Sequence, residues 1–164
     1  MINNFKIKKI QENFSNFEPP SMSPNTKIFW NKAKGFYIWD QNNKKHIDFT
    51  SSIFVTNIGH SNKKLIKKIQ EVLNSPITHS YVYYNKFRYE YIKKLIKFIN
   101  KKKLSKCYLT SSGTESTEAA LKLMRLNGQR VNNEKKGIIC IKGNWHGRTL
   151  GALMMSGIKN QTSW

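Results

Sequence analysis

The sequence predicts an α/β fold in which strands and helices alternate along the chain. Residues 107–110 and residues 138–142 are apolar runs with strand character, and a helical pattern lies between them. The runs are about thirty residues apart, a spacing typical of a right-handed βαβ crossover with parallel strands. A second observation adds an antiparallel part, because residues 28–55 combine aromatic and β-branched clusters with turn signals.

The first elements predicted along the chain are an arm and a small meander. Residues 1–25 contain a short, weak helical pattern followed by closely spaced prolines, and we interpret them as an extended arm. Residues 28–55 are broken at residues 34–35 and again at residues 40–43. Breaks at these two places predict short antiparallel strands joined by turns.

Two amphipathic helices are predicted next. Ser61 or Asn62 can cap the first, whose apolar residues recur at helical spacing, and Pro76 stops the chain beyond it. Asn85 opens the second helix, which continues to Ile99. Lysines cover the other face of the second helix, and we interpret them as a solvated surface, with a nucleic-acid groove as the alternative.

The charge of the chain reflects a composition bias. Its 164 residues include 29 basic and 9 acidic side chains, a formal net charge of +20. Lys, Ile and Asn are abundant together, at 25, 18 and 18 residues, whereas Arg, which is preferred for bidentate phosphate and base contacts, occurs only four times. This pattern favours a coding bias over a nucleic-acid surface.

Several protein classes are disfavoured by the sequence. It has no apolar run of membrane-spanning length, and its first residues lack the features of a secretion signal, so we expect a cytoplasmic protein without a membrane partner. Cys107 and Cys140 each lie in an apolar run, which predicts buried, reduced thiols. Neither cysteine has metal-ligand spacing.

The first candidate site is the turn from Ser112 to Glu115. Gly113 allows a ligand to approach the backbone, and the helix that follows offers unpaired N–H groups and a positive dipole end to an anion such as phosphate. Ser112 with Glu115 also matches a capping box, which needs no ligand. The residues leave both interpretations open.

The second candidate site is the loop of residues 143–149, which contains Trp145, His146 and Arg148 between glycines. Taken alone, Trp145 could be a lid on the core and His146 a structural residue. Ligands of open α/β sheets gather at the carboxyl ends of the strands, where both loops are expected. A phosphate on the first loop and an aromatic face on the second would together bind a flat ring bearing a phosphate, as in pyridoxal phosphate.

Four blocks of sequence resemble the class III pyridoxal-phosphate aminotransferases. They are residues 112–123, residues 145–149, residues 30–49 with their Trp-Asn-Lys-Ala-Lys-Gly start, and the Gly59-His60 pair before the first predicted helix. The resemblance covers roughly residues 28–158. It implies the type I pyridoxal-phosphate-dependent transferase fold, with residues 1–75 as the arm and a small-domain segment and residues 76–164 as the truncated start of the large cofactor-binding domain.

The resemblance also implies roles for individual residues. Ser112, Gly113 and Thr114 would hold the phosphate of pyridoxal 5′-phosphate, and Trp145 would stack on the pyridine ring beside His146. The substrate mouth would lie near two further residues, Ser52 and Ile53. The Schiff-base lysine of the family and the acid on the pyridine nitrogen would lie beyond Trp164, so no catalytic residue is expected in this chain.

The resemblance predicts the N-terminal portion of an aminotransferase that moves an amino group between an amine or amino acid and a keto acid. The full-length enzyme would be a homodimer without a nucleic-acid partner. The alternatives are an aminomutase of the glutamate-1-semialdehyde type, a basic nucleic-acid-binding module exploiting the +20 charge, and an inert truncated remnant.

Overall fold

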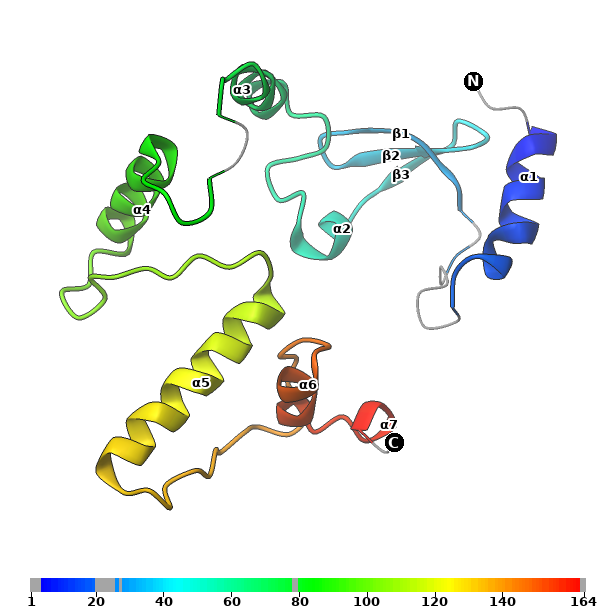
Figure 1. Cartoon of the computed structure of the whole chain (residues 1–164). Helices are drawn as coiled ribbons and strands as arrows, with labels where there is room; N and C mark the ends of the chain where they lie inside the picture. Colours follow the sequence, from blue (N-terminus) through cyan, green and yellow to red (C-terminus); the bar gives the residue numbers. More distant parts are fainter. Residues whose placement is uncertain (1–3, 20–25, 27, 78–79, 163–164) are drawn as a thin grey trace. The chain divides into compact units, whose positions relative to one another are not determined.

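A computed structural model describes residues 4–19, 26, 28–77 and 80–162 of the protein (Figure 1). The chain divides into two compact units, Met1–Val82 and Tyr83–Trp164. The domain division expected from the sequence, 1–75 and 76–164, stays a prediction.

The first unit contains the predicted meander. Strands β1 (Trp30–Lys34), β2 (Tyr37–Asp40) and β3 (Lys45–Ile47) form one antiparallel sheet in the order β1-β2-β3. The Asp40 carboxylate stabilises the second turn, because its Oδ1 accepts the backbone N–H groups of Asn42 and Lys44 at 2.8 and 3.0 Å. The prediction for residues 28–55 is confirmed as far as β3.

The N-terminal arm is more helical than expected. Residues Asn4–Asn13 form helix α1, and a 3-10 turn, η1 (Phe14–Asn16), follows. Ile7 and Ile10 are spaced so that both lie on one face of the helix, and Ile7 is buried. The extended interpretation was therefore wrong for this part, and residues 20–25 lie outside the described residues.

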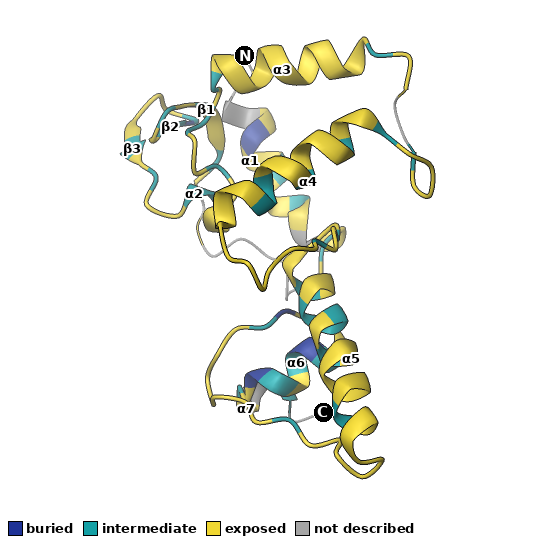
Figure 2. Ribbon diagram, turned by 90° about the vertical axis from the view of Figure 1, so that its left-hand side faces the viewer, coloured by how far each residue is buried: buried dark blue, intermediate teal, exposed yellow. Residues whose placement is uncertain are grey.

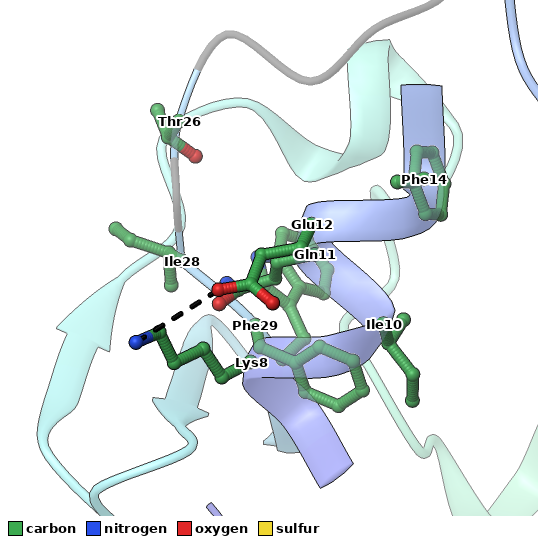
Figure 3. A pocket seen from close by; sticks show the side chains of 9 residues that line it. Lys8, Ile10, Gln11, Glu12, Phe14, Thr26, Ile28 and Phe29 are labelled. Carbon is green, nitrogen blue, oxygen red and sulfur yellow. Dashed lines mark ion pairs between the residues drawn. The ribbon is translucent and has the colours of Figure 1, made fainter. Parts of the chain in front are cut away.

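A pocket of about 660 Å³ lies between α1 and the chain leading into β1 (Figure 3). Ile10, Phe14, Ile28 and Phe29 contribute apolar side chains to it. Its ion pair, Lys8 Nζ to Glu12 Oε1 at 3.8 Å, joins two exposed side chains on α1. The pocket is thus a mainly apolar hollow beside an ordinary surface pair.

Helix α2 (Ser51–Phe54) follows the sheet and has an unusual backbone. All four of its residues have positive φ angles, between 48° and 65°. An L-amino acid pays about 1–2 kcal/mol for this left-handed conformation. The sequence showed no sign of it, because none of the four residues is glycine or asparagine.

Helix α3 (Lys63–Leu73) confirms the first predicted amphipathic helix. Asn62, rather than Ser61, is its cap, because the Asn62 side chain accepts the N–H groups of Lys64 and Leu65. No residue of α3 is buried, so its apolar face is exposed (Figure 2).

The second unit contains the remaining helices, α4 (Lys86–Ile99), α5 (Gly113–Val131), α6 (Leu150–Ser156) and α7 (Lys159–Thr162). Asn85 caps α4 as predicted, accepting the N–H of Arg88. Helix α6 packs against α5, and Ala152 and Ser156 of α6 are buried. Among the described residues, no helix has both the length and the apolar character needed to cross a membrane.

The predicted pair of parallel strands is not formed. Residues 107–110 and 138–142 carry no strand, and Ile139 is fully exposed. Parallel strands are stable inside a larger sheet covered on both faces, and two short runs with exposed side chains do not meet that condition. For the same reason Cys140 is exposed and Cys107 only half-buried, so the predicted burial of the thiols was wrong, although both are free as expected.

Candidate cofactor site

The turn before α5 forms the capping box that the sequence allows. Ser112 Oγ accepts the N–H of Glu115 at 3.3 Å, and Glu115 Oε2 accepts the N–H of Ser112 at 3.1 Å. The same oxygen accepts the N–H of Ser111 at 2.7 Å. The hydrogen bonds of the capping box therefore form without a ligand.

The capping box leaves two donors of the first helical turn for another group. Gly113 and Thr114 are the first residues of α5, and their N–H groups have no acceptor within the part of the chain that the structure describes. A Cβ added to Gly113 would have nothing within 4 Å, so the space beside the Gly113 Cα is open. Two unpaired N–H groups at the positive end of a helix suit a phosphate, and the residues present therefore fit the cofactor phosphate.

The two predicted loops meet at Thr114. Its hydroxyl lies 2.9 Å from the hydroxyl of Thr149, the residue that precedes α6. Gly147 lies so close to Thr114 that an added Cβ would overlap the threonine side chain. Gly147 also has a φ of +127°, which side chains rarely adopt, so only glycine suits this contact.

The aromatic and basic residues of the second loop lie near one another. The guanidinium of Arg148 lies 5.5 Å from the centre of the Trp145 ring, a cation-π contact, and the Trp145 side chain is exposed. His146 lines a pocket of about 500 Å³ that Ser116 and Thr117 of α5 also line. The loop therefore offers an aromatic face and a cation beside the start of α5.

One residue of this region was not singled out by the sequence analysis. Glu118, one turn after Thr114, accepts the hydroxyl of Thr149 at 2.6 Å and the N–H of Ala152 at 3.1 Å. The Thr149 hydroxyl and the Ala152 N–H lower the pKa of Glu118, and burial opposes them. The signal available in the sequence was the spacing, since Glu118 follows Thr114 by one helical turn.

The predicted substrate residues belong to the other unit. Ser52 and Ile53 lie in the left-handed α2, with φ angles of 52° and 57°. The Ile53 side chain is exposed. Their role at a substrate mouth stays a prediction. Within the described ranges, no three His, Cys, Asp or Glu side chains gather as a metal site would require.

The antiparallel meander and the helices that follow it share their fold with part of several solved structures. An (S)-enantioselective omega-transaminase from Thermomicrobium roseum aligns with 98% of this chain and 37% of its own, with a TM-score of 0.80 and 20% identity. An omega transaminase from Pseudomonas jessenii, solved in complex with PMP, aligns with 93% of this chain and 36% of its own, with a TM-score of 0.79 and 22% identity. The predicted fold class, an incomplete α/β domain of the type I pyridoxal-phosphate transferases, is confirmed.

The chain belongs to the class-III aminotransferases, whose family profile matches residues 20–163. A mitochondrial acetylornithine aminotransferase of Candida glabrata is 40% identical over 121 residues, which are 71% of this chain and 28% of the relative. The chain spans about a third or less of the length of the curated relatives it matches.

Proposed function

We propose that this chain is the N-terminal part of a pyridoxal-phosphate-dependent aminotransferase, which moves an amino group between an amine or amino acid and a keto acid. The observation that carries the proposal is the pair of N–H groups at Gly113 and Thr114, open to a phosphate at the start of α5 in a chain of this family. Several relatives named acetylornithine aminotransferase support acetylornithine as the amino donor. We expect a cytoplasmic homodimer for the full-length protein.

Each part of the site has a distinct task in this proposal. The N–H groups of Gly113 and Thr114 and the Thr114 hydroxyl bind the phosphate, while Ser112 keeps the helix start in place through the capping box. Trp145 covers one face of the cofactor ring, and His146 lies beside it. Pyridoxal phosphate itself supplies an electron-withdrawing ring for amino-group transfer. The Schiff-base lysine is expected beyond Trp164.

Binding of pyridoxamine 5′-phosphate to Thr114→Ala tests this assignment. This cofactor form is the suitable probe because its amine does not react with the 25 lysines of the chain. The Thr114 hydroxyl already bonds Thr149, so turning it to the phosphate gains only the difference between two hydrogen bonds. We expect the dissociation constant to rise about fivefold, which corresponds to about 1 kcal/mol.

Thr162→Ala is the matched control, because the Thr162 hydroxyl in α7 likewise makes a hydrogen bond, to the carbonyl of Ile158 just before that helix. Unphosphorylated pyridoxamine should bind wild type and Thr114→Ala equally weakly. If the turn before α5 serves only as a capping box, then Thr114→Ala leaves the pyridoxamine 5′-phosphate affinity unchanged and the proposal fails.

A further inference from the structure

Two side chains on one face of α5 each face a glycine of the second loop and α6. Thr114 packs on Gly147, and Glu118 packs on Gly151. A Cβ at Gly151 would lie 2.5 Å from Glu118 Oε2. Glu118 follows Thr114 by four residues, and Gly151 follows Gly147 by four residues, so the two segments contact in a regular register one helical turn long.

The Glu118 carboxylate takes over the capping of α6. Thr149 precedes α6, but its side chain makes no capping hydrogen bond to that helix. Glu118 instead accepts the N–H of Ala152, the third residue of α6, at 3.1 Å. A side chain from α5 therefore holds the first turn of α6, and this contact joins two elements that are more than thirty residues apart in the sequence.

The same carboxylate determines the direction of a short chain of hydroxyl groups. An ionised carboxylate only accepts hydrogen bonds, so the Thr149 hydroxyl donates to Glu118 across 2.6 Å. The proton of Thr149 is then engaged, and the Thr114 hydroxyl is left to donate to the Thr149 oxygen. Glu118 thereby orients Thr149 directly and Thr114 through it.

We propose that Glu118 is a positioning residue, which caps α6 and orients Thr149 so that the loop carrying Trp145 stays in place against the start of α5. The conclusion that this loop is held in place for the cofactor rests on the function proposed above. The positioning itself rests on the contacts of Glu118 with Thr149, Ala152 and Gly151.

Hydrogen–deuterium exchange without cofactor tests the positioning by itself. In Glu118→Ala the Ala152 N–H loses its acceptor, and we expect its exchange to become at least about tenfold faster. Glu118→Gln keeps a carbonyl oxygen for Thr149 and Ala152 and should restore most of the protection. Gly151→Ala should act like Glu118→Ala, because its new methyl group displaces the carboxylate.

Glu134→Ala is the control, since Glu134 is an exposed residue just beyond α5 with a distant ion pair to Lys136 at 4.0 Å. Circular dichroism should show that all variants keep their helices. Unchanged Ala152 exchange in Glu118→Ala, or an equal acceleration in Glu134→Ala, overturns the proposal. If Glu118→Ala does not fold, Glu118→Gln and Gly151→Ala decide the question in the same way.

A second measurement connects the loop to the cofactor. The dissociation constant of pyridoxamine 5′-phosphate should rise severalfold in Glu118→Ala and recover in Glu118→Gln. Faster exchange with an unchanged dissociation constant overturns the connection between the positioned loop and the cofactor and leaves the proposed function intact. A wild-type chain that binds no pyridoxamine 5′-phosphate contradicts the proposed function, whereas accelerated Ala152 exchange in Glu118→Ala still supports the positioning of the loop.

Discussion

Asp48 connects the end of the sheet to the start of α3. Its Oδ1 accepts the N–H and the hydroxyl of Thr50 and the N–H of Ser51, and its Oδ2 lies 2.8 Å from His60 Nε2. The Asp48 side chain is only 3% exposed. The hydrogen bond with His60, followed by that with the Thr50 hydroxyl, lowers the pKa of Asp48 to about 2.

We expect the stability of the first unit to fall in acid because of Asp48. A carboxylate whose pKa is lowered by folding adds stability that is fully present above its unfolded pKa, here 3.8. That stability is lost as the pH falls from there toward 2. The melting temperature of the wild type should therefore fall more steeply between pH 5 and about 2 than that of Asp48→Asn.

Glu12→Gln removes an exposed carboxylate of the same unit and serves as the control. Its pH dependence should match that of the wild type. Parallel curves for the wild type and Asp48→Asn would show that the Asp48 hydrogen bonds do not contribute to stability.

Trp145 provides a second prediction for a single residue. Trp145→Ala removes the proposed stacking surface and should weaken pyridoxamine 5′-phosphate binding by about 1 kcal/mol, or about fivefold. Trp145→Phe keeps an aromatic face and should have a small effect. A titration with pyridoxamine 5′-phosphate, monitored by the melting temperature, measures the change in affinity of both variants. Tyr108→Ala, at an exposed aromatic residue, is the control. An unchanged cofactor-dependent shift in Trp145→Ala would leave Trp145 with a structural role alone.

At the scale of elements, helix starts follow local rules. Asn62, Asn85 and Ser112 each accept N–H groups of the helix that they open, as the sequence predicts. Each cap depends on a side chain and the two or three residues after it. Helices α3, α4 and α5 were predictable for this reason.

The left-handed backbone of α2 leads to a prediction about stability. Ile53 has a φ of 57° and Val55 a φ of −91°, and both side chains are exposed. Ile53→Gly relieves a cost of about 1–2 kcal/mol against a loss of about 0.5–1 kcal/mol of backbone entropy, so it should stabilise the protein by about 0.5–1 kcal/mol. Val55→Gly should destabilise it by a similar amount. Urea unfolding measures both changes, and equal destabilisation by the two variants would contradict the left-handed assignment.

At the scale of the whole molecule, the chain spans about a third or less of the length of the curated aminotransferases that it matches. We expect the purified 164-residue chain to lack aminotransferase activity, because none of its lysines matches the Schiff-base motif of the family. The assay combines the chain with pyridoxal 5′-phosphate, acetylornithine and a keto acid. Turnover above a control without protein would refute the expectation.

The sequence alone determined the family, the meander, the capped helices and the two loops of the candidate site, because motifs, caps and turns depend on residues close together in the chain. The tertiary structure decided what depends on distant neighbours. Residues 107–110 and 138–142 have strand composition but no strand, since a parallel ladder requires partners and cover that these runs do not find. Glu118 gained its role in the same way, because only the packing of α6 on α5 brings Thr149 and Ala152 to a carboxylate more than thirty residues earlier in the chain.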